Sequence, residues 1–150
     1  MQIVVDDLSG AATQRLLAAH LAGMRATPGE CVHALDLEAL RHPSLTVWTV
    51  RIGDEVIGVG ALKRLDAENA ELKSMRVADG HRGTGAGRGI LRHILAEARA
   101  AGFANVWLET GSSVEFLPAR TLYSSEGFAP CGPYGDYVED PLSVFMTRTL

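Results

Sequence analysis

Cysteine and long apolar runs are scarce in this chain of 150 residues. The two cysteines, Cys31 and Cys131, lack the spacing of a zinc site, and the five histidines contain no HExxH pair. We therefore expect no metal site and a reduced, cytoplasmic protein. No apolar run is long enough to span a membrane. The first ten residues, MQIVVDDLSG, lack the basic and apolar regions of a signal peptide.

Basic residues are too few for a general nucleic-acid-binding surface. The chain has 14 lysines and arginines against 18 aspartates and glutamates, a formal net charge of -4. Nucleic-acid binding usually needs a broad basic face, so we expect no nucleic-acid or membrane partner. No repeat, low-complexity tract or linker interrupts the sequence. Residues 1–150 are therefore interpreted as a single domain.

Turn residues divide the chain into short strands and helices in the order β-α-α-β-β-β-α-β-α-β-β. The three strands in the middle form antiparallel hairpins. The strand-helix-strand unit after them should cross over right-handed, which makes its two strands parallel. We predict an α/β (α+β) fold with a mixed, mostly antiparallel central sheet and helices on both faces. The expected strands are 1–5, 45–52, 55–65, 71–78, 104–110, 128–134 and 143–150, and the expected helices begin near residues 9, 35, 86 and 118.

The segment HRGTGAGRGI, residues 81–90, stands between a predicted strand and a predicted helix. The first N–H groups of a helix have no partner inside the helix, and glycine lets an anion approach them closely. Arg82 and Arg88 would add charge-assisted hydrogen bonds to a phosphate. The P-loop pattern fails because Ala86 and Gly87 replace its lysine and hydroxyl residue, and the GxGxxG dinucleotide pattern fails as well.

The same loop matches [QR]xxGx[GA], and here the sequence resembles the GNAT superfamily of acetyl-coenzyme A-dependent N-acetyltransferases. The resemblance extends over ELKSMRVA, GRGILRHILAEARAAGF, NVWLET and TLYSSEGF, roughly residues 45 to 130. It implies a GNAT-like acyl-CoA N-acyltransferase fold and acetyl-CoA as co-substrate. Family members hold the coenzyme A pyrophosphate with this loop, which assigns cofactor binding to Arg82, Gly83, Thr84, Gly85, Ala86, Gly87 and Arg88.

The resemblance also implies two catalytic residues. A glutamate at the position of Glu71 is the general base in one branch of the family, and Glu71 would act directly or through water. Glu109, on the next predicted strand, is a rival, because parallel strands bring both carboxylates toward one cleft. Solvent is a third possible base. Tyr123 resembles the family tyrosine that protonates the departing thiolate.

The end of the strand before the loop is expected to bind the pantetheine arm through its backbone. The residues concerned are Met75, Arg76 and Val77, and the role requires strand 104–110 to splay away from them. One position departs from the family pattern: Phe116 replaces an asparagine that often helps to hold the cofactor. Its effect on cofactor binding stays open.

The predicted reaction is direct transfer of an acetyl group from acetyl-CoA to a primary amine, with a small-molecule acceptor favoured over a protein. Two alternatives stay open, a coenzyme A-binding sensor with little catalysis and a generic anion-binding regulatory domain. The strands of the tail offer an edge for a homodimer. Weaker candidates for the acceptor wall are His33, Asp36, Asp136, Tyr137 and Glu139, while Cys31 and Cys131 are interpreted as small buried hydrophobes.

Overall fold

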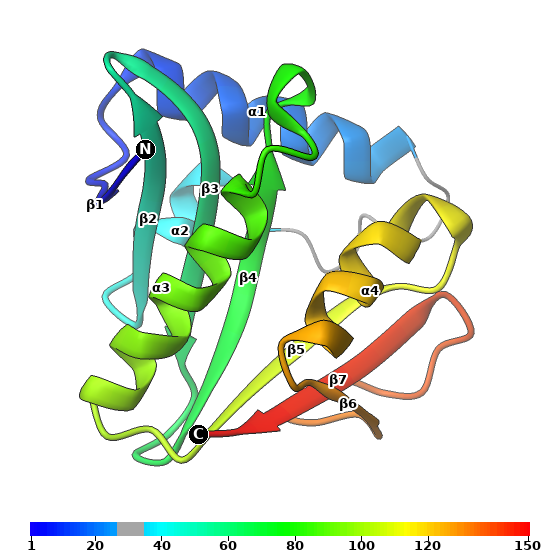
Figure 1. The fold of residues 1–150 in the computed structure, drawn as a ribbon. Helices are drawn as coiled ribbons and strands as arrows, with labels where there is room; N and C mark the ends of the chain where they lie inside the picture. Colours follow the sequence, from blue (N-terminus) through cyan, green and yellow to red (C-terminus); the bar gives the residue numbers. More distant parts are fainter. Residues whose placement is uncertain (27–34) are drawn as a thin grey trace.

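The computed structural model describes residues 1–26 and 35–150, which build a seven-stranded sheet with the strand order β1-β2-β3-β4-β5-β7-β6 (Figure 1). The β4–β5 pair is parallel and the other pairs are antiparallel, which confirms the predicted mixed sheet. The strands are β1 (Gln2–Val5), β2 (Leu45–Ile52), β3 (Glu55–Arg64), β4 (Asn69–Val77), β5 (Asn105–Gly111), β6 (Ala129–Cys131) and β7 (Ser143–Thr149). The helices are α1 (Ala11–Ala26), α2 (Leu37–Leu40), α3 (Ala86–Ala100) and α4 (Leu117–Ser125), with short 3₁₀ turns η2 (Asp79–His81) and η3 (Val114–Phe116).

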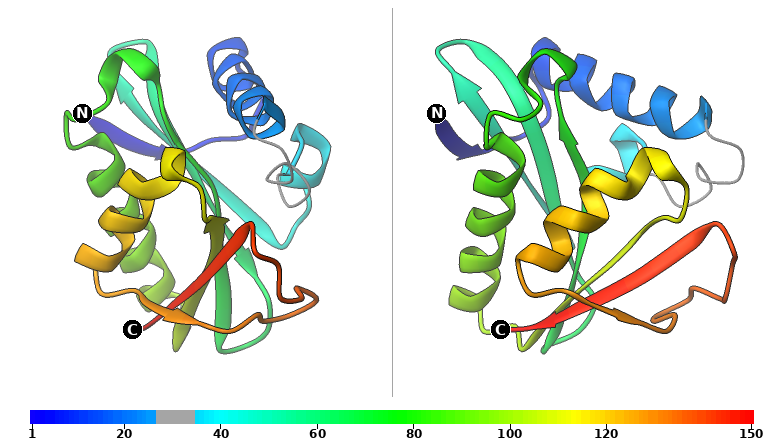
Figure 2. Two further views of the ribbon diagram at one scale, coloured as in Figure 1. Left: turned by 90° about the vertical axis from the view of Figure 1, so that its right-hand side faces the viewer. Right: turned by 45° about the vertical axis from the view of Figure 1, so that its right-hand side comes forward.

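Helices cover both faces of the sheet, as Figure 2 shows from the side. On one face α3 and α4 cover the larger hydrophobic cluster, in which Ile90 and Ile94 are fully buried. On the other face α1 and α2 pack with Leu16 and Leu40 against Val59 of β3. No helix among the described residues is both long enough and apolar enough to cross a membrane.

The sheet splits between β4 and β5. The two strands pair only from Asn69↔Asn105 to Glu71↔Trp107, and beyond that point they diverge (Figure 1). A bulge follows in β4, where Ser74 has φ 56° and the register against β3 shifts. Bulges increase local twist, which turns the end of β4 away from β5. The splay predicted for the strand of residues 104–110 is therefore present.

Two predicted elements are shorter than the sequence indicated. The strand expected over 128–134 ends at Cys131, because Gly132 and Pro133 follow and proline cannot donate a ladder hydrogen bond. Residues 132–142 instead form a loop that returns to the sheet. The short helix begins after Asp36, whose carboxylate accepts a hydrogen bond from the Ala39 N–H at 2.9 Å and caps the helix. Cys31 and His33 lie outside the described residues.

Candidate active site

The glycine loop joins β4 to α3, and no other described part of the protein packs against its glycines Gly83 and Gly85. Gly83 and Gly85 have φ of 77° and 90°, a region that favours glycine, and Gly85 is the N-cap of α3. A Cβ atom added to either glycine would meet no atom within 4 Å. The first N–H groups of α3, beginning at Ala86, have no acceptor within the helix. This geometry suits an anion with several oxygen atoms.

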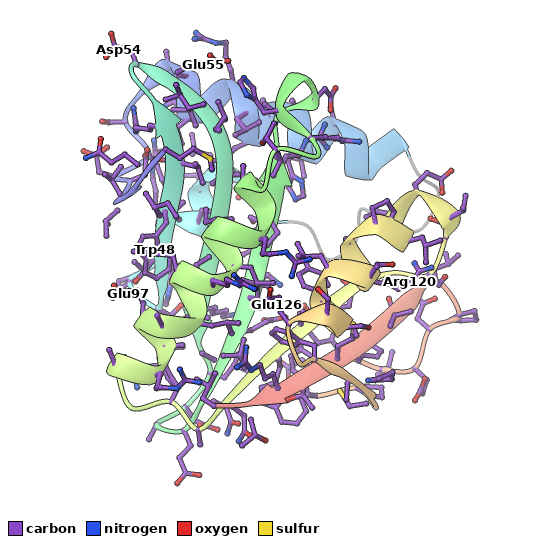
Figure 3. All side chains as sticks on the ribbon, viewed as in Figure 1. Trp48, Asp54, Glu55, Glu97, Arg120 and Glu126 are labelled. Atoms are coloured by element: carbon purple, nitrogen blue, oxygen red, sulfur yellow. The ribbon has the colours of Figure 1, made fainter. Side chains whose placement is uncertain are left out.

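Both arginines of the loop are paired with carboxylates in this structure. Arg82 lies 3.0 Å from Asp79, and Arg88 contacts Glu126 and donates to the Ser125 hydroxyl at 3.0 Å. Glu126, labelled in Figure 3, therefore links the start of α3 to the end of α4. The hydrogen bond from Arg88 lowers the pKa of Glu126. A role for either arginine at a phosphate would require it to leave its carboxylate.

A cleft lies in the split of the sheet, with a volume of about 620 Å³ that includes open solvent. Its walls come from β4, β5, α1 and the start of α4, so it lies between the two diverging strands. The described residues that line it are His20, Leu35, Leu72, Lys73, Ser74, Met75, Leu108, Glu109, Thr110, Phe116, Ala119 and Tyr123. A cleft lined by both apolar and polar side chains suits a small ligand.

Tyr123 reaches this cleft from α4 and is only 6% exposed. Its ring packs edge-to-face against Phe128, with 5.9 Å between centroids. Burial raises the pKa of Tyr123 well above the usual value of a phenol, so the hydroxyl keeps its proton near neutral pH. Phe116 also lines the cleft, which puts an aromatic ring where the family often has an amide.

Glu71 lies at the last position of β4 that pairs with β5 and is 3% exposed. Its Oε2 atom accepts hydrogen bonds from the hydroxyls of Tyr134 at 2.6 Å and Tyr137 at 2.7 Å. The Lys73 ammonium lies 3.4 Å from the same oxygen and donates to the Tyr137 hydroxyl at 2.9 Å. Glu71 is thus a buried carboxylate with three donors, and it is not among the described residues that line the cleft.

The two tyrosines are anchored by an aromatic cluster. Tyr134 packs against Trp107 at 5.3 Å and Tyr137 against Phe145 at 5.5 Å between ring centroids. Burial, and after it the negative charge of Glu71, raises the pKa of both phenols. Both hydroxyls therefore stay protonated and donate to Glu71. The loop of residues 132–142 is in this way fixed to β4.

His20 of α1 is a residue that the sequence analysis missed. Burial, and then the positive charge of Arg76, lowers the pKa of His20 to about 4, so its ring in the cleft is neutral near pH 7. Arg76 lies 3.7 Å from Asp79. No local pattern marks His20, because a histidine in an amphipathic helix is common and its neighbours come from distant strands.

The structure brings together some of the predicted site residues and separates others. Glu109, Met75 and Tyr123 share the cleft, whereas the glycine loop lies at the start of α3. Thr84 donates to the His81 carbonyl at 2.5 Å, and Val77 packs beside Gly87. Asp136 and Glu139 are exposed in the 132–142 loop, and Cys131 is partly buried in β6. Lys73, Ser74 and Tyr134 join His20 as residues of the cleft or of its wall that the motifs alone did not indicate.

Comparisons with known proteins identify the family and the fold of the chain. The model of the acetyltransferase (GNAT) family matches residues 14–128. The uncharacterized N-acetyltransferase YsnE of Bacillus subtilis is 48% identical over 100% of both chains. A Klebsiella pneumoniae protein classed with the acyl-CoA N-acyltransferases superposes with a TM-score of 0.81 at 27% identity, over 99% of this chain and 97% of the other.

A GNAT family acetyltransferase from Elizabethkingia anophelis, solved with acetyl-CoA bound, has the same fold at 18% identity, with a TM-score of 0.74 over 99% of this chain and 97% of that one. The split sheet, the glycine loop that opens α3 and the buried tyrosine beside the cleft are thus found in a chain that matches this family over most of its length. The chain belongs to the GNAT family and is an N-acetyltransferase.

Proposed function

We propose that this enzyme transfers the acetyl group of acetyl-CoA directly to the primary amine of a small molecule. One observation supports this most: a carboxylate, Glu109 of β5, and a buried phenol, Tyr123 of α4, line the same cleft. Formation of an amide from an ammonium and a thioester requires a base that deprotonates the ammonium and an acid that protonates the leaving thiolate. The mixed apolar and polar lining of the cleft favours a small acceptor over a protein.

The donor site has two parts in this proposal. The free N–H groups at the start of α3, together with Gly83 and Gly85, bind the diphosphate of coenzyme A. The backbone of Met75 to Val77 no longer pairs with β5, so it is available to bind the pantetheine arm. The residues present therefore fit the co-substrate, and Phe116 would contact it through its ring alone.

We assign the role of the base to Glu109 rather than Glu71. Glu71 is buried, its Oε2 atom accepts from two phenols, and it does not line the cleft. Glu109 lines the cleft itself. The ammonium of the acceptor gives its proton to Glu109, directly or through water, and the free amine attacks the thioester carbonyl carbon. A C–N bond forms, the C–S bond breaks, and Tyr123 gives its proton to the departing thiolate. The second proton of the attacking nitrogen passes to solvent, and Tyr123 regains a proton from solvent.

Calorimetry with acetyl-CoA, coenzyme A and ATP tests the donor site. We expect saturable binding of the first two at micromolar to millimolar concentration and much weaker binding of ATP. Equal affinity for ATP would favour a generic anion site. Binding of acetyl-CoA without acetylation of any amine in a broad screen would favour the sensor alternative.

The two carboxylates are compared through Glu109→Gln and Glu71→Gln. Loss of a general base typically costs roughly 10²- to 10⁴-fold, and we expect this loss, with a flattened acid limb of the kcat/KM pH profile, only in Glu109→Gln. Glu71→Gln should retain the slope of the profile at a lower rate. The opposite result would return the base role to Glu71.

The role of Tyr123 is tested separately with Tyr123→Phe. We expect kcat to fall roughly 10²-fold or more while the affinity for acetyl-CoA is retained, because the ring still fills its site. Unchanged turnover would remove Tyr123 from the acid role.

A further inference from the structure

We propose that Glu126 is a positioning residue for Tyr123: held by Arg88 and Arg92, it fixes the end of α4 to α3 and so keeps the phenol at the cleft. This inference rests on the proposed function, because it concerns the acid that the function assigns to Tyr123. It also gives Arg88 a role different from the phosphate contact expected from the sequence.

The carboxylate of Glu126 joins the end of α4 to the first two turns of α3 (Figure 3). Its side chain is only 10% exposed, and its Oε1 atom accepts hydrogen bonds from Arg88 and, at 3.0 Å, from Nε of Arg92. The two arginines stand four residues apart, so they project from the same face of α3. A carboxylate shared by two guanidinium groups forms a network, which holds better than an isolated surface pair.

The charge of this carboxylate is maintained at neutral pH. The hydrogen bond from Arg88 lowers the pKa of Glu126, while desolvation works in the opposite direction and is outweighed. Glu126 therefore stays ionised and keeps both charged donors. Hydrogen bonds between two charged groups are stronger than those between neutral groups.

The backbone of Glu126 is fixed as well. Its carbonyl accepts a hydrogen bond from Nη1 of Arg148 in β7 at 2.8 Å. Its N–H group donates to the carbonyls of Leu122 and Tyr123, both at 3.1 Å, and the Tyr123 carbonyl also accepts from the Phe128 N–H at 3.0 Å. The turn that ends α4 is thus tied to α3 on one side and to β7 on the other, and Tyr123 is part of that turn.

Further contacts of Arg88 also lead to α4. Arg88 donates to the Ser125 hydroxyl at 3.0 Å, and this hydroxyl donates to the Leu122 carbonyl at 2.7 Å. Leu122 packs close to the first turn of α3, since a Cβ atom added to Gly87 would lie 3.6 Å from its Cδ2 atom. The absence of a side chain at Gly87 therefore lets the two helices approach each other where Arg88 connects them.

The position of α4 should depend on these contacts. The helix has nine residues, and a helix this short has little stability of its own. It carries Tyr123 to the cleft, and a displacement of about 1 Å at a catalytic group can cost roughly 10²-fold in rate. Releasing Glu126 from α3 should thus slow protonation of the thiolate. The diphosphate site proposed at Gly83 and Gly85 should stay intact.

The test separates catalysis from cofactor binding in Glu126→Gln and Arg88→Gln. Calorimetry measures Kd for acetyl-CoA, and release of coenzyme A measures kcat with an amine found in the acceptor screen. We expect both variants to lower kcat by roughly 10- to 100-fold with little change in Kd. Arg88→Lys keeps a positive charge and should recover part of kcat. The control is Arg99→Gln, at an exposed position in the last turn of α3, which should leave both quantities unchanged.

A second comparison places Glu126→Gln in the Tyr123→Phe background. Since no hydroxyl is left to position, the added change should have little further effect on kcat. A residue that only stabilised the fold would lower kcat by the same factor in both backgrounds. Thermal unfolding verifies that each variant folds. Should Glu126→Gln fail to fold, Arg92→Gln removes one donor from the same carboxylate at an exposed position and takes its place in both comparisons.

Failure of this inference and failure of the proposed function give different results. If Arg88→Gln weakens binding of acetyl-CoA and keeps kcat, or if Glu126→Gln acts equally with and without the Tyr123 hydroxyl, this inference is overturned and the proposed function stands. If acetyl-CoA does not bind, or if no amine is acetylated, the proposed function fails and this inference with it.

Discussion

Among single residues outside the cleft, Asp6 accepts several hydrogen bonds from distant parts of the chain. Its carboxylate accepts from the Leu8 N–H at 2.7 Å, from the Thr13 and Thr49 hydroxyls at 2.8 and 3.1 Å, and from Arg51 at 2.7 Å. These donors come from the turn after β1, from α1 and from β2. A single buried side chain therefore fastens the N-terminal part of the chain to the sheet.

Replacing Asp6 by Asn should cost about 2–4 kcal/mol of unfolding free energy at pH 7, because several buried donors lose a charged acceptor. Burial works to raise the pKa of Asp6, but the hydrogen bonds outweigh it and the pKa is lowered. The stabilisation is thus complete above the unfolded-state pKa and is lost as the pH falls through the folded-state value. Urea unfolding from pH 7 down to pH 3 should show a shallower loss in the variant.

A matched control is Asp54→Asn, in the exposed turn between β2 and β3 that is labelled in Figure 3. We expect this change to stay within about 0.5 kcal/mol, as is usual for surface substitutions. Equal effects of the two variants would contradict the role of Asp6.

The sequence could indicate residues whose conformation depends on adjacent residues in the chain. The glycine loop is contiguous, so its conformation follows from local residue types. Glu71 was placed on its strand correctly, but its environment was not foreseeable, since Tyr134 is 63 residues away in a loop. Lys73 could have been found, because it stands two residues after Glu71 and so projects from the same face.

At the level of elements, the start of α3 provides a sharp comparison between two glycines. Gly85 has φ 90°, a conformation that costs an alanine roughly 1–2 kcal/mol, and it stands where the diphosphate is proposed to bind. Gly89 lies inside α3 with no atom within 4 Å of an added Cβ. Gly85→Ala should lower both the melting temperature and the affinity for acetyl-CoA.

Gly89→Ala should instead stabilise α3 by about 0.5–1 kcal/mol through helix propensity and leave the affinity nearly unchanged. Thermal unfolding and calorimetry on the two variants test the pair. If the Gly85→Ala variant binds acetyl-CoA as well as the wild type does, the proposed role of the glycine loop in binding the cofactor is wrong.

The order of the elements followed from turn residues and periodicity, and the parallel β4–β5 pair followed from the handedness of the crossover. Two features of the strands were not predicted from the sequence. The end of β6 was misjudged because Phe128 to Tyr134 contains enough apolar residues to suggest a strand. The bulge at Ser74 carries no local mark, since it reflects how β4 meets β3.

For the whole molecule, ligand binding should raise the stability of the fold. At an acetyl-CoA concentration of 100 times Kd, linkage predicts about 2.7 kcal/mol of stabilisation. For a chain of this size that corresponds to a rise in melting temperature of roughly 5–10 °C. Differential scanning fluorimetry with acetyl-CoA measures the rise, and ATP at the same concentration is the control. A shift of equal size with ATP would contradict specific coenzyme A binding.

The hydrogen bonds between the 132–142 loop and Glu71 affect the order in which parts of the chain can assemble. The glycine loop is a short contiguous stretch, so little chain entropy is lost when it forms. The contact of Tyr134 with Glu71 instead joins residues that are 63 positions apart, and more chain entropy is lost when it forms. When the chain has been translated only as far as α4, the glycine loop has been made but neither tyrosine of the 132–142 loop has. The contact between this loop and Glu71 can therefore form only after the glycine loop has already been made.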